Sequence, residues 1–326
     1  MPAVDAILEV RGLKTYFRGF EGTVKAVDDI SFSLEAGKIL ALVGESGCGK
    51  SVTAQTLMGL HSSSRTIIEG SVLYKGEEIL GLSRERFAGI RGTGIAMSFQ
   101  EPMSAFDPLY SIGRQMTEAY TAHARVKQSE ARRLAVRALT DVGIADADRR
   151  IDEYPHQMSG GMLQRVLIAI AIMNRPGVLI ADEPTTALDV TIQAQVIRLM
   201  REVQRETGMS VIFITHDLGI VAEIADDVHV MYAGRIVEKA PVGGLFGRPR
   251  HPYTIGLLAS KARREDKGGK LAFIPGSVPR AWEFPDGCRF HPRCPRAMPR
   301  CSSEVPPLFG RGHECACWLF DGEARA

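Results

Sequence analysis

The sequence predicts an α/β fold in which helices cover a parallel sheet. Two patterns carry this prediction. Between residues 178 and 232, apolar stretches of strand length alternate with helical patterns, and residues 39–43 form a fully apolar strand that runs into a glycine-rich loop. Since parallel strands are joined by crossover connections that are usually helical, such alternation is typical of a sheet with helices on both faces.

An antiparallel β subdomain is predicted ahead of this core. Residues 7–10, 24–27 and 30–34 alternate in the manner of strands and are separated by glycines. The apolar strand 39–43 follows, and residues 50–60 beyond its loop suit a helix. Together they predict a strand, loop and helix unit.

A helical insertion is predicted next. Residues 116–142 are polar-rich with a helical pattern, and a second helix over 161–173 is stopped by Pro176 and Gly177. The alternating core then continues with strand 178–181, helix 190–206, strand 210–215, helix 218–225, strand 228–232 and a hairpin-like segment around Gly234. Prolines and glycines multiply after Pro241, which places a domain boundary between about residues 243 and 270.

Composition limits the possible partners. The chain has 326 residues, of which 45% are hydrophobic and 24% charged, and its net charge is only +2. Mixed charges of this kind lack the basic stripe of a nucleic-acid binder, so we expect no nucleic-acid partner. No apolar run reaches the roughly 18 to 20 residues of a spanning helix, and no secretory signal is evident, which favours the cytosol.

The glycine-rich loop fits the pattern G-x-x-x-x-G-K-S and lies between a strand and a helix, as a phosphate-binding P-loop requires. Its backbone amides would wrap around phosphates, Lys50 would add positive charge, and the Ser51 hydroxyl would coordinate Mg²⁺. A chance glycine-rich turn is the alternative. The candidate residues are Gly44, Glu45, Ser46, Gly47, Cys48, Gly49, Lys50 and Ser51.

Paired carboxylates end the apolar strand that begins at Val178. Asp182 and Glu183 are therefore expected at the carboxyl edge of the sheet, where ligands bind in such folds. Asp182 would hold Mg²⁺, directly or through water, and Glu183 would orient or deprotonate the attacking water. Alternatively, the pair only caps the following helix.

Ser159, Gly160 and Gly161, followed by Gln164 and Arg165, resemble the signature motif of ABC ATPases. The resemblance covers about the first 250 residues. It implies a RecA-like P-loop ABC ATPase core with an antiparallel β subdomain and a helical subdomain at about 102–175. The nucleotide-binding domain would span 1–250 and a Cys-rich carboxy-terminal extension 251–326.

The same resemblance implies roles for three further polar residues. Gln100 would sense Mg²⁺ and water and touch the transmembrane partner, Asp189 in Ala187-Leu188-Asp189 would be the D-loop aspartate, and His216 would contact the γ-phosphate. Each has a purely structural alternative: a strand-end polar residue, a helix cap, and a strand-end imidazole. Five motifs in the family's order favour the functional roles.

One aromatic residue in this family stacks on adenine, and Tyr16 and Phe17 are the candidates. Adjacent residues on a strand face opposite ways, so only one can serve. The family's mechanism also needs a second cassette, because a single chain leaves charge in the transition state under-stabilised. Ser159, Gly160 and Gly161 would present a hydroxyl, amides and a helix amino terminus to the γ-phosphate on the opposite subunit.

Five of the six cysteines cluster near the carboxy terminus, whereas Cys48 needs no role. With residues 251–254, His-Pro-Tyr-Thr, this tail resembles the extension of oligopeptide and dipeptide permease ATPases, a branch that includes nickel and glutathione importers. In some members four such cysteines hold an iron-sulfur cluster. By position they are Cys288, Cys294, Cys301 and Cys317, with Cys315 as the spare. We expect a structural [4Fe-4S] cluster, with zinc or free thiols as alternatives.

The function implied is ATP hydrolysis, with Mg²⁺, that energises uptake of short peptides or a related small solute across the inner membrane. The expected partners are two transmembrane permease subunits, a second ABC ATPase in a heterodimer and, indirectly, an external solute-binding protein. The chain would lie on the cytoplasmic face and dock near Gln100 and the helical subdomain. Import of a nickel chelate or glutathione, a soluble non-transport ABC ATPase and a metal-binding regulatory module are the alternatives.

Overall fold

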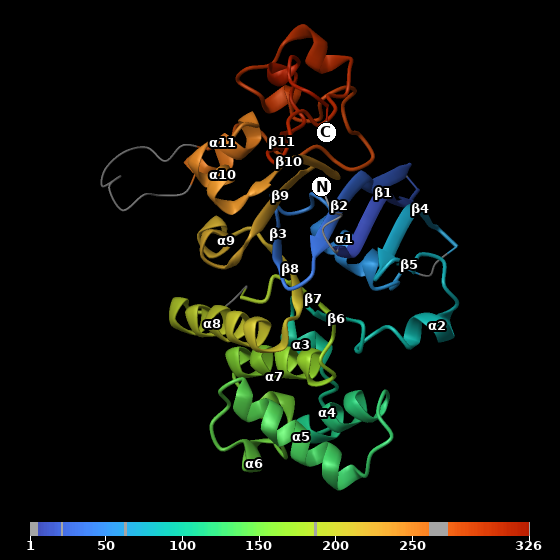
Figure 1. Cartoon of the computed structure of the whole chain (residues 1–326), viewed down its shortest axis with the longest axis vertical. Coiled ribbons are helices and arrows are strands. Elements are labelled where there is room, and N and C mark those ends of the chain that lie inside the picture. The colour runs from blue at the N-terminus through green and yellow to red at the C-terminus, as the bar shows by residue number, and fades with distance from the viewer. Residues whose placement is uncertain (1–5, 21, 62–63, 186–187, 261–272, 326) are drawn as a thin grey trace. The chain divides into compact units, whose positions relative to one another are not determined.

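The computed structural model describes residues 6–20, 22–61, 64–185, 188–260 and 273–325 (Figure 1). These residues form two compact units. The first comprises the described parts of Met1–Leu8, Leu34–Lys38 and Gly81–Ile214, and the second those of Glu9–Ser33, Ile39–Leu80 and Thr215–Ala326. The carboxy-terminal segment therefore belongs to the same unit as the predicted P-loop, residues 44–51.

The first unit contains parallel strands in the order β8-β7-β6. They are β6 (Ile95–Ser98), β7 (Val178–Asp182) and β8 (Ser210–Thr215), with Ile95 opposite Val178 and Val178 opposite Ser210. Every residue of the three strands is buried. Because both faces of these strands are covered, their central residues are apolar instead of alternating, and polar residues stand only at the strand ends.

Helices make up most of the rest of this unit. The stretch expected to be helical over 116–142 forms two helices: the first ends at Thr121 and the second begins at Gln128. The alanine-rich face of α5 (Ala131, Ala135, Ala138) is buried, and α4, α5 and α7 pack together (Figure 1). The helices are α2 (Arg84–Ala88), α3 (Pro102–Ala105), α4 (Ile112–Thr121), α5 (Gln128–Asp141), α6 (Ala147–Arg150), α7 (Gly160–Met173) and α8 (Val190–Thr207), with a 3₁₀ turn, η1, at Pro155–Gln157.

The second unit carries the β subdomain, a sheet in the order β2-β1-β4-β5. Its strands are β1 (Ala6–Arg18), β2 (Thr23–Glu35), β4 (Thr66–Tyr74) and β5 (Glu77–Glu78). Strand β1 extends beyond the expected residues 7–10, because buried side chains recur on it as far as Leu13 and Thr15. The β4–β5 pair is antiparallel.

The second sheet of this unit is mixed, where the sequence predicted a parallel sheet followed by a hairpin-like segment. It runs β11-β10-β9-β3. Strand β3 (Ile39–Val43) is parallel to β9 (Asp227–Tyr232), whereas β10 (Arg235–Pro241) and β11 (Glu314–Cys315) are each antiparallel to their neighbours. Ala233 and Gly234, both with positive φ (47° and 82°), make the tight turn between β9 and β10. The hairpin expected around Gly234 is confirmed.

Helices α1 (Lys50–Leu57), α9 (Leu218–Ile224), α10 (Val242–Gly247) and α11 (Pro252–Ala259) complete the second unit. Its carboxy-terminal segment folds into short 3₁₀ turns, η2 (His291–Arg293), η3 (Pro299–Ser302) and η4 (Trp318–Phe320). Strand β11 adds this segment to the sheet, with Cys315 opposite Glu238. The buried ring of Phe290 joins the core formed by β3, β9 and their helices. The segment is thus integrated into the unit.

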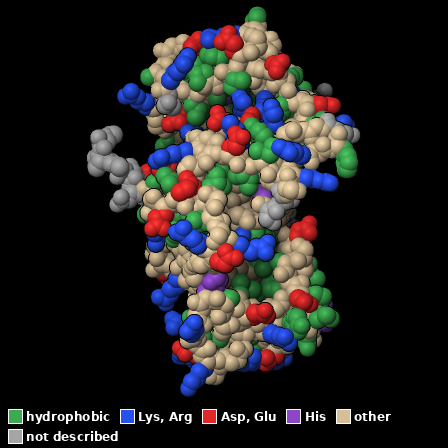
Figure 2. Space-filling model, turned by 90° about the vertical axis from the view of Figure 1, so that its right-hand side faces the viewer, with side chains coloured by type: hydrophobic (Ala, Val, Ile, Leu, Met, Phe, Trp, Pro, Cys, Tyr) green, Lys and Arg blue, Asp and Glu red, His purple; other side chains and the backbone are tan. Residues whose placement is uncertain are grey.

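Among the described residues, no helix has the length and apolar character needed to cross a bilayer. On the face drawn in Figure 2, basic and acidic side chains are interspersed and do not gather into areas of one sign.

Candidate functional site

The predicted P-loop connects β3 to α1 and folds around its own lysine. Lys50 is the first residue of α1 and is 5% exposed. Its ammonium donates hydrogen bonds to the carbonyls of Gly44 (2.9 Å) and Glu45 (3.1 Å) and lies 3.7 Å from the Cys48 sulfur. The loop therefore holds the lysine side chain inside the ring of its own backbone, as a phosphate-binding loop requires.

Two glycines of this loop differ in what surrounds them. Gly49 has φ 109°, and a Cβ there would lie 2.4 Å from the Ala26 carbonyl oxygen. Gly47 also has a positive φ, 78°, but a Cβ there would meet nothing within 4 Å. Gly49 thus permits a close approach between the loop and β2 that no other residue allows.

We predict that Gly49→Ala lowers the free energy of unfolding by about 3 kcal/mol. The new alanine would have to adopt a strained positive φ, and its Cβ would also force the loop and the Ala26 backbone apart. Gly47→Ala is the matched control, since it adds only the cost of the left-handed conformation, about 1 kcal/mol. Urea denaturation measures both. Equal losses in the two variants would contradict the close approach at Gly49.

Glu45, the second residue of the loop, contacts two residues that sequence reasoning did not assign to the site. Its N–H donates to the Tyr253 hydroxyl (2.8 Å), and its carboxylate forms a two-pronged ion pair with Arg293 (2.7 and 3.1 Å). Tyr253 lies within the His-Pro-Tyr-Thr motif, which served in the sequence only as a sign of resemblance to the oligopeptide and dipeptide permease ATPases. No local signal marked Arg293.

The motif's residues explain how Tyr253 reaches the P-loop. The buried His251 ring caps α11 by accepting the Tyr253 N–H at its Nδ1 (3.1 Å), and Pro252 occupies the first turn. Burial lowers the pKa of His251 to about 3, which keeps the ring neutral and able to accept. Tyr253 then lies at the start of a fixed helix.

Tyr16 and Phe17 face opposite ways on β1, as expected. The Tyr16 hydroxyl donates to the buried carboxylate of Asp28, which also pairs with Arg235 (2.9 Å) and with Arg289. Burial, and then the bond to Asp28, raise the pKa of Tyr16 above its usual value. Phe17 instead packs edge-on against the His61 ring at 5.2 Å between centroids.

In the first unit the structure brings Gln100 and Glu183 together. The Gln100 amide donates to a Glu183 carboxylate oxygen at 3.2 Å. Glu183 follows β7 with φ 46°, a left-handed conformation that is uncommon for this residue type, and its N–H donates to the Ile214 carbonyl. Asp182, which ends β7, is 3% exposed. Strained backbone that is fixed by a strand neighbour often accompanies a functional side chain.

Ser159 and Asp189 both cap helices. The Ser159 hydroxyl accepts the Met162 N–H (3.3 Å) at the start of α7, and Asp189 accepts the N–H groups of Thr191 and Ile192 at the start of α8. Asp189 thus caps a helix, as the structural alternative predicted, and this cap does not exclude its role as the D-loop aspartate. Ala187 lies outside the described residues.

The remaining candidates differ in exposure. Ser159 and Gly160 are exposed, and a Cβ at Gly160 would meet nothing within 4 Å, so this end of α7 is open to a ligand. A Cβ at Gly161 would press on Ile192 at 3.1 Å. His216 is exposed directly after β8, in the second unit, and Ser51 lies in the first turn of α1.

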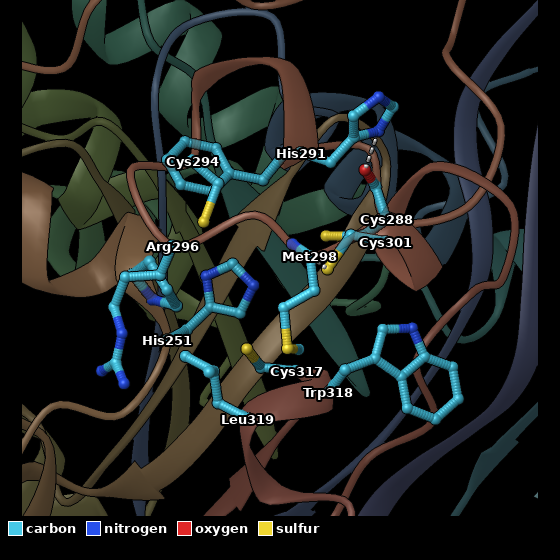
Figure 3. Close-up of a pocket in the computed structure, with 12 residues that line it drawn as sticks. His251, Cys288, His291, Cys294, Arg296, Met298, Cys301, Cys317, Trp318 and Leu319 are labelled. Carbon is cyan, nitrogen blue, oxygen red and sulfur yellow. Dashed lines mark hydrogen bonds between the residues drawn. The ribbon is translucent and has the colours of Figure 1, made fainter.

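Four cysteines of the carboxy-terminal segment line one small cavity (Figure 3). They are Cys288, Cys294, Cys301 and Cys317, the four selected by position, and Met298, Trp318 and His251 also border the cavity. Cys315 does not line it but is hydrogen-bonded to Cys317. Burial raises the pKa of Cys288 to about 11, and the bond from Cys315 lowers that of Cys317 to about 7. Within the described ranges, no three His, Cys, Asp or Glu side chains are close enough to hold one metal ion.

Comparisons with known proteins agree with these observations. Residues 27–186 match the family model described as ABC transporter, and residues 237–301 match that of the oligopeptide/dipeptide transporter carboxy-terminal region. The chain is 46% identical to the dipeptide transport ATP-binding protein DppD of Bacillus subtilis, covering 98% of this chain and 97% of that one. It is also 46% identical to the oligopeptide transport ATP-binding protein AppD of that organism, covering 98% of each.

A solved structure shares the fold. It is the ATP-binding cassette MJ0796, determined as a dimer in a post-hydrolysis state bound to ADP and Pi. The TM-score is 0.65 at 23% identity, over 72% of this chain and 98% of that chain.

Proposed function

The chain belongs to the ABC transporter family as an ATP-hydrolysing subunit of an oligopeptide/dipeptide importer, and we propose how its residues divide that work. Lys50 and the P-loop amides bind the phosphates of ATP. The hydroxyl of Ser51 and the carboxylate of Asp182, with Gln100, are oxygen donors of the kind that Mg²⁺ prefers, and the ion would neutralise phosphate charge. The contact that supports the assignment best is the hydrogen bond between Gln100 and Glu183.

Glu183 orients or deprotonates the attacking water in this proposal. The amide of Gln100 donates to a Glu183 carboxylate oxygen and so orients the carboxylate, which would act as the base toward water. His216, exposed after its strand, contacts the γ-phosphate. The reaction is ATP plus water giving ADP and phosphate.

Phe17 stacks on adenine in this proposal. The Tyr16 hydroxyl donates to Asp28, whereas the Phe17 ring packs against the edge of the His61 ring. An aromatic ring without a hydrogen-bonding group suits stacking on the heterocyclic adenine base.

A second cassette completes the site across a dimer. Exposed Ser159 and Gly160 at the amino terminus of the 14-residue helix α7 offer a hydroxyl, amides and a positive dipole to a γ-phosphate on the partner. The dimeric MJ0796 cassette supports this arrangement by fold. We infer a related second ATPase as the partner, in a heterodimer with Asp189 at the interface.

Two permease subunits are the expected docking partners, at the cytoplasmic face of the inner membrane, with an external binding protein supplying peptide. Exposed apolar side chains flank Gln100 along the chain in the first unit: Phe99 (41% exposed), Met103 (57%) and Leu109 (78%). Apolar side chains that gather beside polar ones mark protein interfaces. The relatives named for dipeptides and oligopeptides favour short peptides over nickel chelates or glutathione.

Permease coupling is tested by the rate of ATP hydrolysis in lipid with the permeases and partner ATPase. We expect the permeases to raise the rate at least about tenfold, and Leu109→Asp to remove this rise while the basal rate stays within about twofold, because a charge opposes burial. Val305→Asp, at another exposed apolar residue (50%), is the control. Full activity without permeases would favour a soluble, non-transport ATPase.

We also propose a structural [4Fe-4S] cluster at the four-cysteine cavity. Four thiols from segments with little regular structure surround it, and such segments need a cross-link to be ordered. The four cysteines are widely spaced in the sequence and lack the paired C-x-x-C of zinc ribbons, which favours a cluster over zinc. Zinc and free thiols are the alternatives.

Anaerobically purified protein should contain about 4 iron atoms per chain if the cluster forms. Cys294→Ser should lower the iron content severalfold, because it removes a thiolate ligand, whereas Cys315→Ser should retain it. Elemental analysis measures both. Zinc in place of iron, or equal iron in the two variants, would contradict the cluster.

A further inference from the structure

One arginine of the carboxy-terminal segment holds the P-loop directly. Arg293 Nη1 and Nη2 donate to the two carboxylate oxygens of Glu45, at 2.7 and 3.1 Å. The Arg293 side chain is 6% exposed and that of Glu45 is 30%. A bidentate pair withdrawn from water is stronger and more directional than a surface ion pair.

The guanidinium is fixed from its other side as well. Arg293 Nε donates to the Pro275 carbonyl (2.9 Å), and Nη1 also reaches the Tyr232 hydroxyl (3.4 Å). Arg293 ends the turn η2, which lies between the two cavity cysteines Cys288 and Cys294. The cysteine cavity and the P-loop are therefore joined by a single short segment.

Glu45 carries a negative charge within a loop whose ligand is a polyanion. Its backbone is engaged on both sides, by Tyr253 at the N–H and by Lys50 at the carbonyl. An uncompensated carboxylate there would repel phosphate and compete for Lys50. Arg293 supplies the compensating charge and directs the carboxylate toward the carboxy-terminal segment.

We propose that Arg293 is a positioning residue for nucleotide binding, which neutralises and orients Glu45 so that the P-loop accepts the phosphates of ATP. The proposal rests on the assignment of residues 44–51 as the phosphate-binding loop. It makes the carboxy-terminal segment part of the nucleotide site, in addition to its cysteine cavity.

The test measures MgATP affinity of the full chain. Arg293→Ala should raise the Kd about tenfold, because a buried ionic hydrogen bond is lost and Glu45 keeps its charge. Arg293→Lys should give a smaller rise in Kd, since lysine retains the positive charge but cannot form the two-pronged pair with Glu45. Arg300→Ala is the control, because Arg300 also pairs with carboxylates of the segment, Glu304 and Asp321, but with none in the P-loop.

The double variant separates charge compensation from damage to the fold. Adding Glu45→Gln to Arg293→Ala should return the Kd to within about threefold of the parent, because no charge is left unpaired. A double variant as weak as Arg293→Ala alone would overturn the proposal. Amide hydrogen exchange of residues 44–51 without nucleotide gives a second readout: Arg293→Ala should speed it and Arg300→Ala should not. Unchanged exchange would also overturn the proposal, whereas failure of the parent to bind MgATP would count against the proposed function instead.

Discussion

Replacing Glu183 by Gln should lower the rate of ATP hydrolysis by at least about a hundredfold while MgATP still binds. Removal of a general base costs roughly two to four orders of magnitude in rate. The amide retains the size of the side chain, and it can still contact Gln100, which lies 3.2 Å from the carboxylate. Phosphate release measures the rate, and nucleotide fluorescence measures the affinity.

The control for this variant is Glu202→Gln on α8, where the carboxylate is exposed and the rate should stay within about twofold. A Glu183→Gln protein that hydrolyses ATP at the parent rate would show that water is activated elsewhere. Comparable losses in both variants would indicate general damage to the unit.

Replacing Lys50 by Met should raise the Kd for MgATP about a hundredfold, with a matching loss of hydrolysis. Lys50 lies inside the predicted P-loop, where its side chain donates to the carbonyls of Gly44 and Glu45. Ionic hydrogen bonds to phosphate contribute about 1.5 to 3 kcal/mol each, and about 3 kcal/mol corresponds to this change in Kd.

The matched control is Lys14→Ala, which breaks only a surface ion pair with Glu69 (3.2 Å). Its Kd should equal that of the parent chain. Denaturant unfolding without nucleotide completes the comparison, since a collapse of the fold in Lys50→Met would explain weak binding without any contact to phosphate. Retained affinity in a folded Lys50→Met protein would contradict the assignment of the P-loop.

Local patterns were enough to predict the strand, loop and helix around Lys50. An apolar strand, glycines in fixed positions and a helix-compatible segment are adjacent in the sequence, and the structure places β3 and α1 on either side of the loop. The hairpin at Gly234 is equally local. The end of β1 and the break between α4 and α5 were not predicted, because tertiary burial determines where those elements stop.

Contacts between distant residues could not be predicted. Glu45 and Arg293 are 248 positions apart, and neither shows a periodicity that points to the other. The capping histidine and Tyr253 were visible as a motif, but their contact with the P-loop depends on how α11 packs. The choice of four cysteines came from a resemblance, and the cavity that they line is consistent with it.

The central claim is that ATP hydrolysis in this chain drives import of peptides. It is tested most directly by peptide accumulation in vesicles that contain the proposed partners, namely the permeases, a binding protein and a second ATPase subunit, with a labelled dipeptide and internal ATP. We predict accumulation against the gradient with the parent chain and none with Glu183→Gln. Accumulation that persists with Glu183→Gln, or a parent system that hydrolyses ATP but moves no peptide while it moves a nickel chelate or glutathione, would contradict the claim.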